Sequence, residues 1–393
     1  MSAPDDVPER IDHLCDRVAA AGYPTSSDWR EAFHAAPRHL FIPERAWAEP
    51  NSPEPGFVID RSIDEAAWWD AAYSDNAIIT QRDDGATDVA EDGVPTSSCS
   101  APATVVEFLE ALRPEDCNRV LEVGTGTGWT AGLIAHRVGE GNVVSVEVDA
   151  GVSERAAKNL AAAGLAPRLV VRDGTLGFPG AAPFDRVHVA VGVAEIPYAW
   201  VEQSRPGGVI VAPYMPGYGF GWFARLHVVG DGTAVGRFPG MAGYMMLRSQ
   251  RPARGPAGEF VHGDFVESTT RLDPRRVEGD SYSADLAISA MVPGVQTRLY
   301  HGEGDEADEC TFWILERDAR DGSWASVDYI PGDAEFVVQQ HGERRLWDEV
   351  EAAYLRWLSW GRPGQDRFGL TVTPEGQRVW LDSPDHVVSR MAG

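Results

Sequence analysis

The chain has 393 residues, of which 43% are hydrophobic and 24% charged, a composition typical of a globular protein long enough for two domains. Its 34 Lys and Arg residues against 60 Asp and Glu residues give a net charge of −26, which disfavours nucleic acid and anionic membranes as partners. No apolar run approaches the roughly 20 residues of a membrane helix, and no signal-peptide pattern is present, so we expect a cytoplasmic protein.

The first part of the chain shows two different patterns. Apolar residues at helical spacing predict an N-terminal helical segment within residues 1–47, ending near Pro37 and Pro43. Residues 48–97 contain several Pro, Gly and Asp residues and little periodicity, apart from an aromatic group around Trp68. We therefore predict a long irregular insertion there, of the kind that is usually functional or mobile.

Residues 98–214 alternate between strand and helix patterns. Helices are predicted at 102–112, 128–139, 153–164 and 196–204, and strands at 119–123, 142–148, 168–171, 184–192 and 207–214. Such alternation with short connections indicates an α/β fold with a doubly wound parallel sheet. Ligands of such sheets bind at the carboxyl ends of the strands, so the turns there are the candidate site.

Residues 215–393 change to hairpin-like runs and predict an additional α+β C-terminal domain. Three pairs of strands are expected across turns within residues 222–238, 311–330 and 370–381. One amphipathic helix is expected at 343–360.

The glycine-rich turn at residues 124–128, GTGTG, follows the first predicted strand of the α/β region. It lacks the full Gly-x-Gly-x-x-Gly dinucleotide spacing and the Lys of a phosphate loop. Glu122 lies inside the preceding strand, where an anion would repel a pyrophosphate but suit the amino group of a cationic amino-acid ligand. This favours S-adenosylmethionine over NAD.

Two further acids follow the next two strands. Glu147 is placed to accept hydrogen bonds from a ribose diol, and Asp173 stands where adenine is commonly held. Each acid alone is equally compatible with a solvated turn or a helix N-cap. The occurrence of all three acids, Glu122, Glu147 and Asp173, at three successive strands favours the cofactor interpretation.

The four cysteines, Cys15, Cys99, Cys117 and Cys310, are scattered singly. No spacing of Cys and His residues suggests a zinc or redox site, so we expect no metal.

These motifs resemble the protein-L-isoaspartate O-methyltransferase family over residues 36–213. The similar segments are APRHLFIPERAW at 36–47, VLEVGTGTGW at 120–129, RDGTLGFPGAAPFDRVHVAVG at 172–192 and IPYAWVEQSRPGGVIVAP at 196–213. The resemblance implies a Rossmann-like class I S-adenosylmethionine-dependent methyltransferase domain, with S-adenosylhomocysteine as the product. The implied cofactor contacts are Ser97, Ser98, Cys99, Ser100, Glu122, Gly124, Thr125, Gly126, Thr127, Gly128, Trp129, Glu147, Val148, Asp149, Asp173 and Gly174.

The family's Thr-Ile-Ser-x-Pro segment, whose serine lies at the reacting groups, is matched by SSCSAP at 97–102. Aligning Pro102 places Ser100 on that serine and Ser98 on the threonine, and both are expected to be catalytic, orienting the acceptor carboxylate. The alternative is that Ser98 and Ser100 merely cap the following helix.

Further roles are also implied by the resemblance. Val191, Gly192 and Val193 are expected to face the substrate backbone. No acid–base step is required of His34 or His39, because a carboxylate acceptor is already ionised at neutral pH.

The insertion and the C-terminal extension depart from the compact repair enzymes. In this the chain is similar to an extended branch of the family associated with ribosomal peptide natural products (graspetides and lanthipeptides). That resemblance implies methylation of an aspartate in a cyclised precursor peptide, followed by collapse of the ester to an aspartimide.

For the C-terminal domain we expect peptide recognition through exposed tryptophans. The alternative is that these tryptophans form the core of that domain. These are Trp313, Trp324, Trp347, Trp357, Trp360 and Trp380. Two alternatives for the whole protein remain, a general isoaspartyl repair methyltransferase and a non-catalytic peptide-binding scaffold with a degenerate fold.

Overall fold

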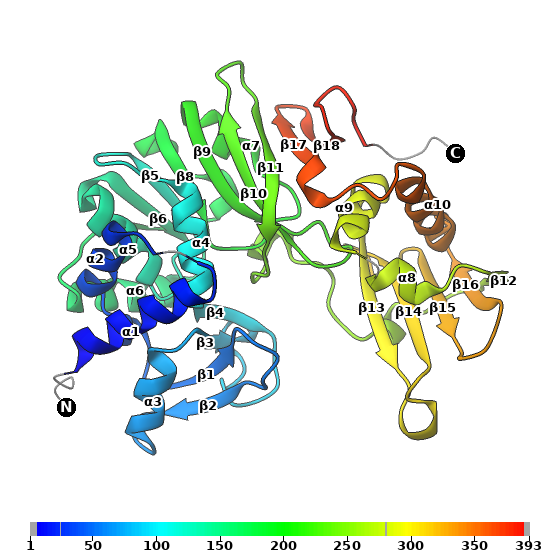
Figure 1. Ribbon diagram of the computed structural model, residues 1–393, viewed down its shortest axis with the longest axis horizontal. Helices are drawn as coiled ribbons and strands as arrows, with labels where there is room; N and C mark the ends of the chain where they lie inside the picture. Colours follow the sequence, from blue (N-terminus) through cyan, green and yellow to red (C-terminus); the bar gives the residue numbers. More distant parts are fainter. Residues whose placement is uncertain (1–5, 24, 280, 389–393) are drawn as a thin grey trace. The chain divides into compact units, whose positions relative to one another are not determined.

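The computed structural model describes residues 6–23, 25–279 and 281–388, which fall into two compact units. The first unit comprises Met1–Val191, Pro197–Ala212 and His227–Gly232. The second comprises Gly192–Ile196, Pro213–Leu226 and Thr233–Gly393. Figure 1 shows the helices and strands of each unit.

The first unit contains the predicted parallel sheet, in the order β9-β8-β5-β6-β7. Its strands are β5 (Val120–Val123), β6 (Val143–Glu147), β7 (Arg168–Val171), β8 (Phe184–Val189) and β9 (Ser204–Tyr214). The connecting helices are α4 (Pro102–Leu112), α5 (Trp129–Val138), α6 (Ala150–Ala162) and α7 (Tyr198–Glu202). All four residues of β5 are buried, as expected for the central strand of a sheet covered on both faces. The predicted α/β fold class is confirmed.

Two helices and a short 3-10 helix precede this sheet, namely α1 (Val7–Ala20), α2 (Ser27–Ala35) and η1 (Arg38–Phe41). The apolar residues at helical spacing, including Ile11, Leu14 and Trp29, are buried. The helical periodicity of this segment therefore reflects a packed face, as predicted.

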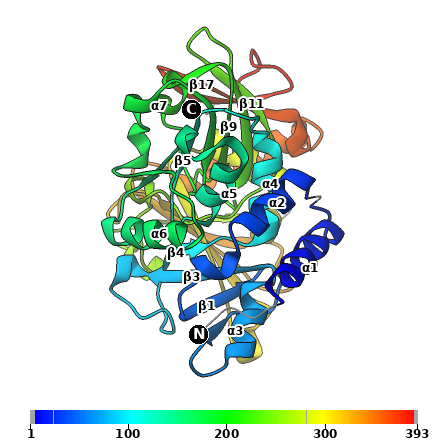
Figure 2. The ribbon, with the colours of Figure 1, turned by 90° about the vertical axis from the view of Figure 1, so that its left-hand side faces the viewer.

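Residues 48–97 are not irregular, and this part of the prediction was wrong. They supply most of a four-stranded antiparallel sheet in the order β2-β1-β3-β4. Figure 2 shows β1, β3 and β4 of this sheet together with α3. The elements are β1 (Arg45–Pro50), β2 (Phe57–Asp60), α3 (Glu65–Ala72), β3 (Asn76–Arg82) and β4 (Pro95–Cys99). The strands are short and interrupted by register shifts between β3 and β4, so no alternation long enough to recognise survives in the sequence.

The second unit contains strands β10 (Trp222–Val228), β11 (Ala234–Met241), β17 (Phe368–Thr373) and β18 (Gly376–Leu381), with β17 between β11 and β18. A five-stranded antiparallel sheet follows the order β12-β16-β15-β14-β13. Its strands are β12 (Val266–Thr270), β13 (Val295–His301), β14 (Cys310–Glu316), β15 (Trp324–Tyr329) and β16 (Phe336–His341). Helices α8 (Pro274–Gly279), α9 (Tyr282–Met291) and α10 (Leu346–Ser359) complete the unit.

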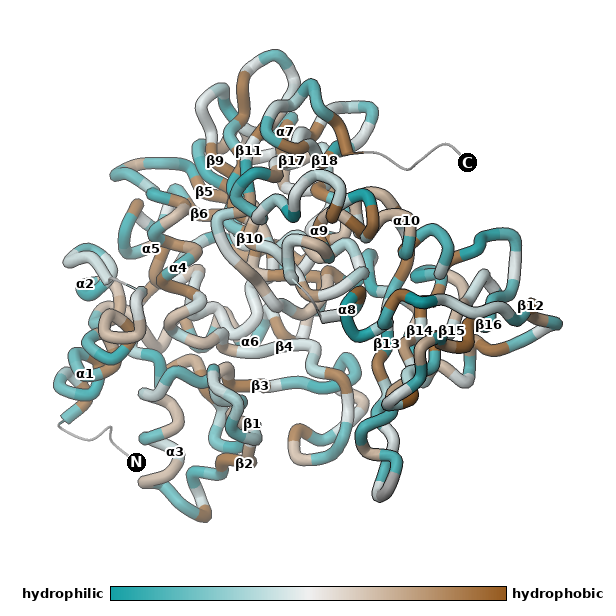
Figure 3. The backbone as a smooth tube through the Cα atoms, turned by 45° about the vertical axis from the view of Figure 1, so that its right-hand side comes forward, coloured by the Kyte–Doolittle hydropathy of each residue, from teal (hydrophilic) through white to brown (hydrophobic). Residues whose placement is uncertain are grey.

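Within the five-stranded sheet, β14 (CTFWILE) carries mostly apolar residues, whereas β12 (VESTT) is mostly polar; Figure 3 colours the backbone of this sheet by hydropathy. Four of the six tryptophans considered for peptide recognition are at most 3% exposed, and these are Trp324, Trp347, Trp357 and Trp380. They belong to the core of the unit, which is the alternative interpretation stated above.

Within the described ranges, no helix combines the length and the hydropathy that crossing a membrane would require.

Candidate active site

The glycine turn lies at the carboxyl end of β5 and has a backbone that side chains would disturb. Gly124 has φ +93° and Gly126 has φ +53°, in the left-handed region that favours glycine. A Cβ on Gly126 would come within 3.0 Å of the carbonyl oxygen of Ser98. The turn therefore requires glycine for a close approach of the serine segment.

Glu147 ends β6 and organises this turn. Its Oε2 accepts a hydrogen bond from the Gly126 N–H (3.0 Å), and its Oε1 accepts from the N–H groups of Val148 (2.9 Å) and Asp149 (3.1 Å). Burial is the main cause of the raised pKa of this carboxyl. A carboxylate offers about four acceptor positions, so roughly one remains on Oε2 for a ligand hydroxyl.

Glu122 does not reach the surface of the site, contrary to our expectation. Its side chain is 0% exposed, because it points from the middle of a central strand into the packed interior. Oε2 accepts from Ser145 Oγ (2.5 Å), which also contacts the hydroxyl of Thr125 (2.6 Å). Burial raises the pKa of Glu122 to about 8, so this side chain is largely neutral at pH 7 and does not supply the negative charge that we expected.

His188 is the register partner of Glu122 on β8 and was missed by sequence reasoning. Its Nδ1 lies 3.8 Å from Glu122 Oε1, and burial lowers the pKa of this histidine to about 4. Within the part of the chain that the structure describes, neither ring nitrogen has a hydrogen-bond partner. The two side chains therefore form a buried and largely uncharged pair beneath the glycine turn.

The acids after β6 and β7 act as caps. Asp149 Oδ1 accepts from the N–H groups of Gly151 and Val152 at the start of α6. Asp173 Oδ1 accepts from the Thr175 N–H (2.9 Å), at the start of a 3-10 helix. The capping alternative therefore holds for both acids, whose remaining carboxylate oxygens are not used in these caps.

Three other predicted cofactor residues, Val148, Gly174 and Trp129, differ in their exposure and in their hydrogen bonds. Val148 is 38% exposed beside Glu147. The carbonyl of Gly174 accepts from Trp200 Nε1 (2.9 Å). Trp129 is 2% exposed and donates its indole N–H to the Ala36 carbonyl (3.0 Å), so its side chain belongs to the core.

The serine segment begins in β4, which pairs with β3 in the antiparallel sheet, and it approaches the glycine turn. Neither Ser98 nor Ser100 has a hydroxyl hydrogen bond to any residue in the described ranges, whereas Ser97 Oγ accepts from Thr80 Oγ1 (3.2 Å). Cys99 is 1% exposed and fills the interior. The N-cap of α4 is Ala101, without a side-chain cap, so the alternative of capping serines is wrong.

Arg38 fixes the position of this segment and was also missed. Its side chain is 1% exposed and donates to the carbonyls of Ala72 (2.8 Å), Asn76 (2.5 Å) and Ser100 (3.0 Å). The guanidinium also lies 5.1 Å from the ring centre of Trp129, the first residue of α5. One buried cation thus connects the serine segment with the helix that follows the glycine turn.

The loop predicted to face the substrate is divided between the two units. Val191 lies in the first unit, where a Cβ on Gly124 would approach its Cγ1 to 2.7 Å. In the second unit, Gly192 N–H donates to the Met245 carbonyl (2.8 Å) and Val193 N–H to the Pro213 carbonyl (2.9 Å). The N–H groups of these two residues are therefore already used within the protein.

His34 and His39 do not meet the serine segment through any hydrogen bond of the described residues. His34 contacts Asp12 (3.0 Å), and His39 Nδ1 contacts the Tyr73 hydroxyl (2.6 Å). Burial lowers the pKa of His39 to about 4, which keeps this ring neutral at pH 7.

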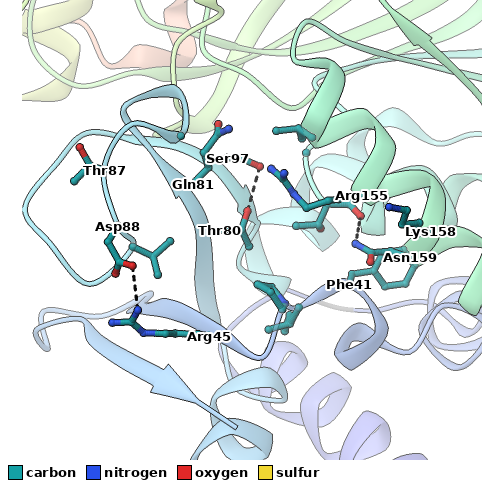
Figure 4. Close-up of a pocket in the computed structure, with 17 residues that line it drawn as sticks. Phe41, Arg45, Thr80, Gln81, Thr87, Asp88, Ser97, Arg155, Lys158 and Asn159 are labelled. Atoms are coloured by element: carbon teal, nitrogen blue, oxygen red, sulfur yellow. Dashed lines mark hydrogen bonds and ion pairs between the residues drawn. The ribbon is translucent and has the colours of Figure 1, made fainter. Parts of the chain in front are cut away.

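A cavity of about 540 Å³ borders the same turn (Figure 4). Its walls include Ser97, Gly126 and Thr127, together with side chains of α6 and of the sheet that contains β3. Among the described residues, no group of three or more His, Cys, Asp or Glu side chains is arranged to hold a metal ion.

Comparison with known proteins agrees with this geometry. The protein-L-isoaspartate(D-aspartate) O-methyltransferase family matches residues 59–234. A protein-L-isoaspartate O-methyltransferase of Thermococcus onnurineus is 33% identical over 51% of this chain and 76% of its own length. One of Methanopyrus kandleri is 31% identical over 54% of this chain and 80% of its own.

A solved structure of a protein-L-isoaspartate O-methyltransferase has a TM-score of 0.54 and 21% identity, over 95% of this chain and 100% of that one. The fold is that of a class I S-adenosylmethionine-dependent methyltransferase, with additional antiparallel sheets. The chain belongs to the protein-L-isoaspartate(D-aspartate) O-methyltransferase family, and it is an enzyme that uses S-adenosylmethionine as its methyl donor.

Proposed function

We propose that this carboxyl methyltransferase esterifies an aspartate side chain in a cyclised ribosomal precursor peptide, and that the ester then closes to an aspartimide. The observation that carries the proposal is the pair of hydroxyls of Ser98 and Ser100, which have no hydrogen-bond partner among the described residues and belong to the segment beside the glycine turn after β5. The proposed partner is the modified precursor peptide.

The residues around the turn fit the cofactor. Gly124 and Gly126 leave the backbone open to close approach, and Glu147 keeps one acceptor position for a ribose hydroxyl. We assign Val148, the 124–128 turn, Asp149 and Asp173 to the same site. Glu122 and Trp129 support it from the interior rather than by contact.

The cofactor supplies a methyl group activated by its sulfonium. The acceptor carboxylate is ionised at neutral pH, so the chain needs to orient this group and exclude water rather than remove a proton. Ser100, with Ser98, donates hydrogen bonds to one carboxylate oxygen while the other oxygen forms the new C–O bond and the C–S bond breaks. Alignment of this kind contributes several kcal/mol, up to roughly 7–11.

The closure of the methyl ester to an aspartimide uses groups of the substrate and no side chain of the enzyme. The backbone nitrogen that follows the esterified aspartate attacks the ester carbonyl, loses its proton and expels methanol. A ring that holds this nitrogen near the carbonyl favours the closure, because the two groups are then already oriented.

The substrate class is supported by the length that this chain has in addition to the part that aligns with two of its relatives. The relatives from T. onnurineus and M. kandleri align with only about half of this chain. The β1–β2 hairpin and α3 lie between η1 and the serine segment, and we propose that they shape access to the site. We propose peptide recognition for the second unit, through surfaces other than its four buried tryptophans.

The test is to incubate the protein and S-adenosylmethionine with the cyclised precursor encoded beside its gene, and separately with a linear isoaspartyl peptide. We expect methyl gain and then methanol loss on the cyclised precursor only. Ser100→Ala should lower turnover at unchanged thermal stability, whereas Ser359→Ala in the second unit should leave turnover unchanged.

A general isoaspartyl repair activity is the second candidate. The solved structure that aligns with 95% of this chain favours this candidate, because that protein has a similar extent and is named a protein-L-isoaspartate O-methyltransferase. Turnover of the linear isoaspartyl peptide would select this alternative. If the protein binds no S-adenosylmethionine, the result would instead support the non-catalytic peptide-binding scaffold.

A further inference from the structure

The cavity beside the glycine turn has a charge unlike that of the protein as a whole. Three cations line it, Arg45, Arg155 and Lys158, against the single carboxylate of Asp88. The chain carries a net charge of −26, so the excess of positive side chains in this cavity runs against the charge of the molecule as a whole. Figure 4 shows these side chains around the cavity, with the Arg155 side chain directed toward Ser97.

The three cations differ in how far their charge is already neutralised. Arg45 pairs with Asp88 (3.0 Å), and Lys158 pairs with Glu154 (2.7 Å) one turn earlier on α6. Arg155 takes part in no hydrogen bond and no ion pair within 4.0 Å among the described residues. Arg155 is therefore the cation whose fork of N–H donors remains available to a carboxylate.

Polar side chains line the same cavity as this guanidinium. Gln81, Ser97 and Asn159 line the same walls, and Asn159 Nδ2 is held by the Thr127 carbonyl (3.0 Å). The volume of about 540 Å³ falls within the usual range of ligand sites, roughly 300–1,000 Å³.

The cavity borders the proposed cofactor turn through Gly126 and Thr127, and it contacts the serine segment through Ser97. Ser97 lines the cavity, whereas Ser98 and Ser100 are not among its walls. Consecutive Cα atoms are about 3.8 Å apart, so the Ser97 and Ser100 Cα atoms are at most about 11 Å apart. An extended peptide covers about 10 Å in three residues, so it can span a separation of this size.

We propose that this cavity is a specificity subsite for an acidic side chain of the substrate, about three residues from the methylated aspartate. Arg155 binds the carboxylate of that Asp or Glu residue. The proposal rests on the peptide methyltransferase function proposed above and adds a sequence preference to it.

The test compares two peptide substrates that differ only by Glu or Gln at the third residue on either side of the acceptor aspartate. We expect the wild-type enzyme to prefer the Glu peptide in kcat/KM by roughly five- to tenfold, through KM rather than kcat. Arg155→Gln should remove the preference and leave turnover of the Gln peptide unchanged. Arg205→Gln, an exposed arginine of the same unit outside the cavity, should keep the preference.

A charge exchange keeps the test specific for the subsite. Arg155→Glu should favour a peptide with Lys at the same position, an effect that a general loss of stability would not produce. Equal kcat/KM for the Glu and Gln peptides with the wild type, or an unchanged preference in Arg155→Gln, would overturn the proposal.

A binding measurement separates this proposal from the proposed function. Fluorescent peptides with Asn in place of the acceptor aspartate are titrated by anisotropy in the presence of S-adenosylhomocysteine. If the Glu peptide binds more tightly through Arg155 although no peptide is methylated, the subsite stands and the proposed function fails. Equal binding of the Glu and Gln peptides would refute the subsite alone.

Discussion

At the scale of single residues, Gly126 shows how a turn and its neighbour constrain each other. Its φ of +53° and the 3.0 Å approach to the Ser98 carbonyl both oppose a side chain. Glu147 then holds the N–H of the same residue. The shape of the turn is therefore set before any ligand binds.

Gly126→Ala should lower the free energy of unfolding by about 1–2 kcal/mol, because an L-residue at positive φ costs roughly 1 kcal/mol and the new methyl displaces Ser98. The affinity for S-adenosylhomocysteine should fall at least about tenfold, or 1.4 kcal/mol. Calorimetric titration and thermal melting measure the two effects. Gly141→Ala is the control, since a Cβ there meets nothing within 4 Å, and an equal loss of affinity in both variants would contradict the prediction.

Glu122 gives a prediction about pH. Its pKa in the folded protein is raised to about 8, so between about pH 4.5 and 8 the folded state holds a proton that the unfolded state has released. The wild type therefore loses this contribution as the pH rises. Glu122→Gln should gain stability relative to the wild type over the same interval, by at most about 1.4 kcal/mol per pH unit.

Urea denaturation at several pH values measures this difference, with Glu91→Gln at an exposed position as the control. A difference between the wild type and Glu122→Gln that stays constant from pH 5 to pH 8 would show that Glu122 is ionised in the folded protein.

Sequence reasoning placed the turn and Glu147 at the strand ends where the structure has them, but it did not foresee that Glu122 is enclosed. A residue at the end of a strand emerges at the edge of the sheet, so its position in the motif suffices to place it. A residue inside a strand can point into either packed layer, and only its neighbours on β6 and β8, Ser145 and His188, show that this carboxyl is enclosed.

At the scale of elements, the α/β core was predictable and the sheet at residues 45–99 was not. The core strands are followed by helices at regular intervals, and this rhythm is visible in the sequence. The antiparallel sheet depends on pairing between β1 and β3, which lie about 30 residues apart, and on the buried side chain of Arg38. An arginine in the sequence gives no sign that its partners are backbone carbonyls.

Arg38→Met should destabilise the protein by about 3 kcal/mol or more, because buried carbonyls on two segments lose a charged donor. Arg38→Lys should cost less, since one cation and three donors remain. Arg30→Met should cost less than about 1 kcal/mol, because the Arg30 pair with Asp16 lies near the surface. Chemical denaturation gives all three values, and similar losses for Arg38→Met and Arg30→Met would contradict the role of Arg38.

At the scale of the whole molecule, the two compact units should respond differently to the cofactor. The glycine turn, Glu147 and the serine segment all belong to the first unit. S-adenosylhomocysteine at about 100 times its dissociation constant should stabilise the unit that binds it by about 2.7 kcal/mol.

Differential scanning calorimetry should therefore show one transition that shifts with S-adenosylhomocysteine and one that does not. A single transition that shifts as a whole would mean that the two units unfold together.

The contacts of Arg38 also have an evolutionary consequence. Its acceptors are main-chain carbonyls, which every amino acid possesses, so residues 72 and 76 can change identity without losing the contact, whereas residue 100 is also constrained by the proposed role of the Ser100 hydroxyl. The arginine itself has no substitute with the same number and arrangement of donors. An alignment of homologues should therefore show an invariant arginine whose partner positions drift, a pattern that covariation between side chains would not detect.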